Sequence, residues 1–268
     1  MTFLQYWLVN HPTIVNFSWT QGQTPGSSPL FLTLTVISYL SITCLLTHLH
    51  LPPIKPNLLK LITVVHNIVL LVLSLIMAVG CILSTLLHPP HLHWIICIPP
   101  QTPPTGPLFF WAYVFYLSKI LEFLDTLLII LSGSIKRLTF LHVYHHSTVV
   151  IMCYIWLHTS QSLFPAVLMT NASVHVLMYT YYLSCALGLR PRWKRLVTEC
   201  QILQFKYSFL AMAVMLWFHF TGLGCSGIWG WCFNIVFYAS LLVLFVDFHA
   251  KNYGGSKSIK VCDLDKRP

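Results

Sequence analysis

Histidines set within apolar sequence are the residues of this chain best suited to chemistry. His142, His145 and His146 fall three and four positions apart, so a helix would place them on one face. His175 lies alone in the next apolar stretch. A neutral imidazole can serve as a metal ligand, a general base or a nucleophile. The pattern therefore predicts a site that uses one of these three chemistries.

Three further ionisable residues precede the histidines in the sequence. Lys119, Glu122 and Asp125 follow one another at intervals of three inside an apolar run. Each such group costs roughly 2.5–3.5 kcal/mol at the centre of a membrane helix, so this stripe must face a protein interior or a wet cavity. Lys119 and Glu122 can instead form a purely structural pair, whereas Asp125 is left without an obvious cation. His66 is isolated, and we interpret it as structural.

Amides and tyrosines extend the polar set on two later stretches. On the first they share a helical face with His175, and on the second they share one with Thr198. The members are Asn171, Tyr179, Tyr182, Gln201 and Gln204.

A metal site is one alternative for the histidines. His-x-x-His-His resembles a box of the di-iron membrane desaturases and hydroxylases, but those enzymes use several such boxes. This chain has one box plus His175, and with Asp125 these residues would hold one metal ion at most. The nine cysteines form no CxxC pair and show no zinc spacing. We therefore expect no metal, and an imidazole beside carboxylates and amides is then a base or a nucleophile.

The elements that must position these residues are membrane helices. Hydrophobic residues make up 56% of the 268 positions and charged residues 8%, against about 25% charged in soluble domains. A water-facing surface cannot be built from so few charges, which excludes a soluble globular protein, a disordered chain and a coiled coil. The net charge of +9 comes from short basic clusters between apolar runs. This arrangement predicts a lipid bilayer as partner and argues against nucleic acid.

Seven stretches are long enough to cross a bilayer as helices, which takes about 20 mostly apolar residues each. The predicted spans are Leu30–Leu49, Leu61–Leu87, Leu108–Leu131, Leu138–Leu157, Leu163–Leu187, Leu196–Phe220 and Ile228–His249. The expected fold class is therefore all-α and integral to the membrane. Only residues 158–162 separate the fourth span from the fifth, so we expect these two spans to form a tight helical hairpin.

Lys and Arg residues in the connections give the orientation of the spans. Such residues follow the first, third, fifth and seventh spans, and the alternate connections carry none. The positive-inside rule then places the C-terminus in the cytosol and the N-terminus on the lumenal side. The expected organisation is a lumenal segment 1–29, a single membrane domain 30–250 and a basic cytosolic tail 251–268.

Two features of the lumenal side agree with this orientation. Asn16 begins an Asn-x-Ser glycosylation sequence in the N-terminal segment. Cys97 and Cys225 fall in different lumenal loops, where they can form a disulfide or remain two free thiols.

The polar residues of the different spans are expected at similar depths in the membrane. With a rise of 1.5 Å per residue, the polar faces of four spans meet in the cytosolic half of the membrane. A site there is open to an anionic cytosolic co-substrate, and the basic clusters would attract its phosphates. The remaining apolar depth suits a long hydrocarbon chain.

Four motifs in order make the chain resemble the ELO family of fatty-acid elongases. They read KILEFLDT (119–126), HVYHH (142–146), NASVHVLMYTYY (171–182) and TECQILQF (198–205). The resemblance covers about residues 30–250. The stretches YWLVNHP (6–12) and GIWGWCFN (227–234) are similar to those of plant members.

The resemblance implies a multi-pass protein of the endoplasmic reticulum membrane. Spans 2–4 and 5–7 would form an inverted barrel of two three-helix units, with the first span outside it. The implied reaction condenses a long-chain acyl-CoA with malonyl-CoA to give 3-ketoacyl-CoA, CO2 and CoA, with no tightly bound cofactor. The expected partners are the ketoacyl-CoA reductase, hydroxyacyl-CoA dehydratase and enoyl-CoA reductase of the elongation cycle, and homo-oligomerisation stays open.

The resemblance also implies roles for the catalytic residues. His145 would take the acyl group as an acyl-imidazole, and His175 would sit opposite to position malonyl-CoA or assist its decarboxylation. His142 and His146 would orient groups or act as base, with Asp125 and Glu122 as their hydrogen-bond partners. The expected substrate-binding set is Lys119, Glu122, Asn171, Tyr179, Tyr182, Gln201 and Gln204.

Two other classes of function stay open at this point. A metal-dependent membrane oxidoreductase would carry bound iron or zinc. A non-enzymatic lipid carrier or sensor would tolerate replacement of His145 without loss of any turnover.

Overall fold

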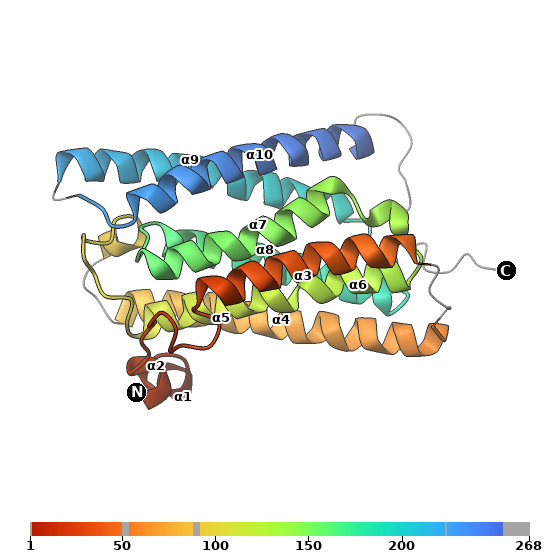
Figure 1. The fold of residues 1–268 in the computed structure, drawn as a ribbon, viewed down its shortest axis with the longest axis horizontal. Coiled ribbons are helices and arrows are strands. Elements are labelled where there is room, and N and C mark those ends of the chain that lie inside the picture. Colours follow the sequence, from red (N-terminus) through yellow and green to blue (C-terminus); the bar gives the residue numbers. More distant parts are fainter. Residues whose placement is uncertain (1, 50–53, 88–91, 223, 254–268) are drawn as a thin grey trace.

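The computed structural model of the protein describes residues 2–49, 54–87, 92–222 and 224–253. Within these residues the chain is helical, and its one piece of β-type pairing is an isolated bridge between Ser18 and Thr105. The expected tail beyond Tyr253 lies outside the described residues. The long helices, which run along a common axis (Figure 1), are α3 (Pro29–His48), α4 (Pro56–Leu87), α5 (Pro107–Leu121), α6 (Phe123–Leu131), α7 (Phe140–His158), α8 (Phe164–Ala186), α9 (Lys194–Thr221) and α10 (Ile228–Tyr253).

Local sequence explains where several of these helices begin. Ser28 caps α3 by accepting a hydrogen bond from the Phe31 N–H, and Pro29 occupies the first turn. Thr139 caps α7 in the same way through the His142 N–H. Gly106, at φ 85°, turns the chain into α5. The cap at Thr139 sets the start of α7 and thereby the face that carries the three neighbouring histidines.

In the described part of the chain, five helices are long and apolar enough to cross a membrane, namely α3, α4, α7, α9 and α10. The other two predicted spans depart from that pattern. The third is interrupted at Glu122, the one residue between α5 and α6. The fifth, α8, is a helix of 23 residues, but its Asn, His and Tyr side chains lower its hydropathy.

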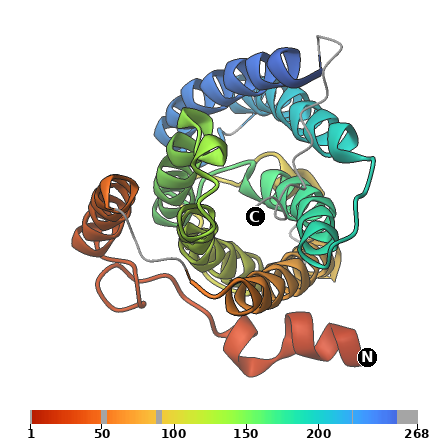
Figure 2. The same ribbon diagram turned by 90° about the vertical axis from the view of Figure 1, so that its right-hand side faces the viewer.

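Six helical segments form a closed ring of neighbours. Around the ring α4 packs on α5, α5 on α7, α7 on α10, α10 on α9, α9 on α8, and α8 returns to α4. Viewed along the axis, these helices surround a common centre, and α3 stands outside the ring (Figure 2). There α3 contacts α6 and α7.

The expected hairpin of the fourth and fifth spans is wrong. Although residues 159–163 connect α7 directly to α8, the two helices take different neighbours and lie on opposite sides of the ring (Figure 2). The reason lies in the connection, whose Ser160, Gln161 and Ser162 are buried. The connection thus crosses one end of the ring instead of turning back at its surface.

That crossing closes one end of the ring. Ser162 accepts a hydrogen bond from the Ile98 N–H at 2.9 Å and donates its own N–H to Ser226. A disulfide joins Cys97 to Cys225 beside these contacts. Below the connection the fully buried ring of Trp156 stacks near the rings of Phe115 and Phe164. Packed aromatic side chains therefore fill the interior of the ring of helices at this end.

Ionisable side chains lie inside the ring, and apolar side chains cover its outside. Lys119, Glu122 and His175 are buried inside, whereas large aliphatic side chains such as Leu61 and Val243 are 59% and 68% exposed outside. The connections that carry Lys and Arg, together with the end of α10, lie at the opposite end from the closed one (right in Figure 1). Buried ionisable groups and an apolar exterior are expected of a protein that is surrounded by lipid.

Candidate active site

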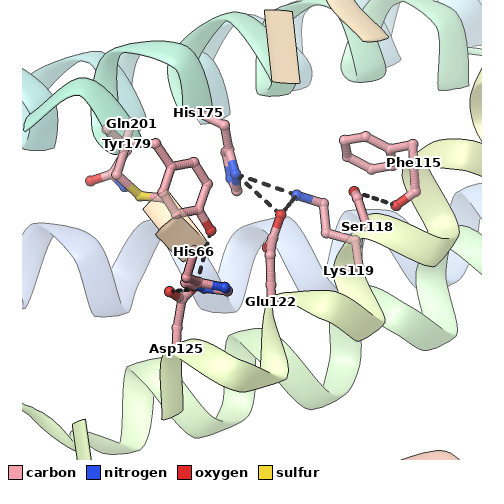
Figure 3. Close-up of polar contacts among 10 residues, drawn as sticks. His66, Phe115, Ser118, Lys119, Glu122, Asp125, His175, Tyr179 and Gln201 are labelled. Carbon is pink, nitrogen blue, oxygen red and sulfur yellow. Dashed lines mark hydrogen bonds and ion pairs between the residues drawn. The ribbon is translucent and has the colours of Figure 1, made fainter. Parts of the chain in front are cut away.

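The turn between α5 and α6 places a buried ion pair against α8 (Figure 3). Lys119 Nζ donates to Glu122 Oε1 at 2.7 Å, and both side chains are almost fully buried. His175 Nδ1 lies 3.5 Å from the Lys119 nitrogen and 3.4 Å from the same Glu122 oxygen. The second oxygen, Glu122 Oε2, has no hydrogen-bond partner among the described residues. The three side chains form one compact charged unit, and Glu122 Oε2 can still accept a hydrogen bond.

Asp125 is held from two other helices (Figure 3). His66 of α4 donates through Nε2 to Asp125 Oδ1 at 2.9 Å, and the Tyr179 hydroxyl of α8 donates to Oδ2 at 2.9 Å. The expectation that His66 is isolated is therefore wrong, because it supplies the partner that Asp125 lacked in the sequence. The sequence does hold a signal for this contact, because an ionisable residue such as His66 within an apolar span needs a partner.

His142 is anchored through a hydroxyl. Its Nε2 lies 2.8 Å from Thr126 Oγ1, and Thr126 in turn is 2.9 Å from the Tyr39 hydroxyl of α3. The expectation that Asp125 and Glu122 would hydrogen-bond the histidines of α7 does not match these contacts. The peripheral helix thus reaches the histidine cluster through Thr126, a contact that no spacing in the sequence indicates.

His145 borders a narrow cavity inside the ring. Asn171 of α8 and Gln204 of α9 line the same cavity, and the rest of its wall is apolar: Phe115, Val149, Met152, Val167, Phe205, Phe237, Tyr238 and Leu241. His145 Nδ1 and Asn171 Oδ1 are buried without a hydrogen-bond partner among the described residues. A few polar groups in a mostly apolar wall are the usual composition of a site that holds a mostly hydrocarbon ligand, and this cavity, at about 10 Å³, would have to widen to admit one.

The box histidines are in mutual contact. The ring centroids of His142 and His146 are 4.4 Å apart, and those of His145 and His146 are 5.4 Å apart. His146 Nδ1 has no partner in the described part of the chain. All three imidazoles therefore belong to one cluster on α7.

Two of the predicted residues lie away from these groups. Gln201 donates to the sulfur of Met178 at 3.7 Å (Figure 3), and Tyr182 packs edge-on against Tyr179 and Tyr181. Neither lines the cavity of His145. The structure therefore gives these two residues a place beside the site rather than in it.

A wider apolar groove lies outside the ring, between α3 and α6. Tyr39 and Thr126 line it together with Phe31, Leu34, Phe123 and further aliphatic side chains. His145, Asn171 and Gln204 are absent from its wall. Because its position would face lipid, we assign the chemistry to the narrower cavity inside the ring.

The arrangement offers a nucleophile or base and two amide groups in the wall of one cavity, and a separate charged unit of Lys119, Glu122 and His175. His145 supplies an imidazole nitrogen, the amides supply N–H donors for a developing oxyanion, and Lys119 with Glu122 supplies fixed charges near His175. Within the described residues, no three His, Cys, Asp or Glu side chains are grouped so as to hold a metal ion.

Known proteins resemble this chain over most of its length. A 258-residue stretch is 34% identical to fatty acid elongase A of Dictyostelium discoideum and covers 92% of both chains. A 210-residue stretch is 34% identical to fatty acid elongase 4 of Trypanosoma brucei brucei, covering 77% of this chain and 76% of that protein. The protein named fatty acid elongase 3-like of Arabidopsis thaliana is 27% identical over 266 residues, with 92% and 91% covered. The sequence model of the ELO (GNS1/SUR4) family matches residues 24–261, and the chain therefore belongs to that family.

Proposed function

We propose that this protein is a fatty-acid elongase that condenses a long-chain acyl-CoA with malonyl-CoA to give 3-ketoacyl-CoA, CO2 and CoA. The observation that carries the proposal is the narrow cavity inside the ring that His145, Asn171 and Gln204 line together. Family membership and the names of the relatives support fatty-acid elongation. No observation favours the metal-dependent oxidoreductase.

The first half-reaction transfers the acyl group to His145. A nitrogen of the neutral imidazole attacks the thioester carbonyl, the C–S bond breaks, and CoA leaves with the imidazole proton. The amide N–H groups of Asn171 and Gln204 stabilise the negative charge on the carbonyl oxygen during the attack. A free ring nitrogen is required, and His145 Nδ1 has no partner among the described residues.

The second half-reaction forms the new carbon–carbon bond. Malonyl-CoA loses CO2, and the resulting enolate attacks the acyl carbon while the bond to His145 breaks. His175, which contacts Lys119 and Glu122, would position the malonyl group in this step. The imidazole recovers its proton from solvent, so atoms and charge balance over the cycle without a bound cofactor.

The surroundings of the site fit this pair of substrates. Exposed Lys136, Arg137, Arg190 and Arg192 lie at the end of the ring opposite the closed one, where they would attract the phosphates of CoA. We propose that seven helical segments cross the endoplasmic reticulum membrane, with the ring as a barrel of two three-helix units. The end with the basic residues would face the cytosol, as would the C-terminus. The reductases and dehydratase of the cycle would then meet the product on that side.

The direct test is product formation by the purified, folded protein. A panel of saturated and monounsaturated acyl-CoAs is incubated with malonyl-CoA labelled in all three malonyl carbons, and products are read by mass spectrometry. We expect 3-ketoacyl-CoA that has gained two labelled carbons, with one labelled CO2 released per product. Absence of product from every acyl-CoA would contradict the proposed function.

The position of Met152 predicts a change in product length. Met152 is buried in the cavity wall, seven residues and about 10 Å beyond His145 towards the closed end. Met152→Ala should lengthen the preferred acyl chain, and Met152→Trp should shorten it, because each alters the apolar depth. Chain-length profiles of the products measure this, with Trp217→Ala on the exposed face of α9 as the control. Unchanged profiles in both Met152 variants would count against the cavity as the acyl site.

The orientation is testable through Asn16, which is exposed at the end of α2 (Pro12–Val15). In reticulum membranes the chain should carry an endoglycosidase-sensitive glycan that Asn16→Gln removes. The matched control places the sequence Asn-Phe-Ser after residue 253, where it should stay unmodified. The reverse pattern, with modification only at the C-terminal end, would overturn the orientation.

A further inference from the structure

We propose that His66 is a positioning residue for the condensation reaction, acting through Asp125 and Tyr179 on His175. The inference rests on the proposed function and adds a residue that none of the four motifs contains. It starts from one contact, in which His66 Nε2 donates to Asp125 Oδ1 at 2.9 Å (Figure 3).

The carboxylate of Asp125 depends on this contact for one of its two side-chain hydrogen bonds. Among the ion pairs of the described residues, Asp125 has His66 as its partner, while Lys119 is taken by Glu122. The side chains of His66 and Asp125 are only 5% and 16% exposed. A buried carboxylate needs donors that replace its hydration. His66 therefore fixes where the carboxylate sits.

The fixed carboxylate in turn holds Tyr179. Its second oxygen, Oδ2, accepts the Tyr179 hydroxyl at 2.9 Å. Tyr179 is fully buried, so the surrounding side chains also hold its ring in place. The chain of contacts therefore links α4 to α6 and α6 to α8 through two short hydrogen bonds.

Tyr179 limits the orientation of His175. The two residues are one helical turn apart on α8, and their ring centroids lie 5.7 Å apart in an edge-to-face arrangement. His175 Nδ1 sits only 3.4–3.5 Å from Glu122 and Lys119, so a small rotation of its ring would break both contacts. Asp125 also precedes Thr126, the hydroxyl partner of His142. Displacement of Asp125 would thus disturb both histidine groups of the site.

Variants at position 66 that differ only in reach test the proposal. His66→Gln keeps an N–H donor near the position of Nε2, whereas His66→Asn is chemically similar but too short. We expect His66→Asn and His66→Leu to lower kcat roughly 10- to 100-fold, the usual effect of losing an orienting partner, with KM for acyl-CoA unchanged. His66→Gln should recover most of kcat. His48→Leu, an exposed histidine at the end of α3, is the control for loss of an imidazole.

The comparison of Asn with Gln decides the outcome even if His66→Leu does not fold. Equal kcat values in the folded Asn and Gln variants would overturn the proposal, as would a wild-type kcat in folded His66→Leu. A wild-type protein that elongates no acyl-CoA would instead overturn the proposed function. The contact itself is then read from the infrared carboxylate band that Asp125→Asn removes. This band should shift in His66→Asn and stay in place in His66→Gln, and an unshifted band in both would refute the pairing.

Discussion

Replacing His145 with alanine is expected to abolish condensation, lowering kcat by at least about 10³-fold, because the variant lacks the nitrogen that takes the acyl group. Release of CoA from acyl-CoA in the absence of malonyl-CoA should disappear together with product formation. The fold should persist, since His145 Nδ1 has no hydrogen-bond partner to lose among the described residues. The measurement combines product analysis with circular dichroism and a thermal midpoint.

A matched histidine on the same helix provides the control for this variant. His158 ends α7, is exposed, and contacts the ring of Tyr154. His158→Ala should keep wild-type turnover. Condensation by folded His145→Ala within a few-fold of wild type would exclude His145 as the residue that takes the acyl group.

Removing Lys119 should have the largest effect on stability. Lys119→Met leaves the Glu122 carboxylate buried without its main cation, and breaking a buried pair in this way costs about 3–5 kcal/mol. In a chain of this size such a loss lowers the thermal midpoint by about 10 °C. The midpoint of the detergent-solubilised protein, followed by circular dichroism, measures the change.

The double variant Lys119→Met/Glu122→Leu distinguishes two causes of the lost stability: the loss of attraction between the two charges, and the burial of a Glu122 carboxylate without a cation. It should recover most of the lost stability, because neither charge then remains in the interior. Arg195→Met breaks the exposed pair of Arg195 and Glu199 and should leave the midpoint nearly unchanged. A double variant as unstable as Lys119→Met would show that the stability comes from the packing of Lys119 against Phe115 instead.

Hydropathy and spacing predicted the long helices because both depend on local sequence alone. The predicted ends of the first, sixth and seventh spans fall close to those of α3, α9 and α10. The turn at Glu122 could not be predicted in this way. A stripe of Lys119, Glu122 and Asp125 at intervals of three fits an unbroken helix equally well, and the surrounding residues are apolar on both sides of the turn.

Contacts between residues that are far apart in the sequence also could not be predicted. Intervals of three and four placed the box histidines on one face, but they cannot show that His66 reaches Asp125 across 59 positions or that Tyr39 reaches Thr126 across 87. The predicted hairpin of α7 and α8 failed for a similar reason. Loop length limits the distance between two helix ends, whereas the burial of Gln161 and its neighbours across the ring decides how the helices diverge.

The proposed reaction passes through a covalent acyl-enzyme, and the most direct measurement looks for this species. The folded protein is mixed with acyl-CoA alone, quenched, and examined by intact mass and by peptide mapping. We expect one CoA released per active site and one acyl group attached to the peptide that contains His145, with no adduct in His145→Ala. CoA release that requires malonyl-CoA, or an acyl group on another residue, would contradict it.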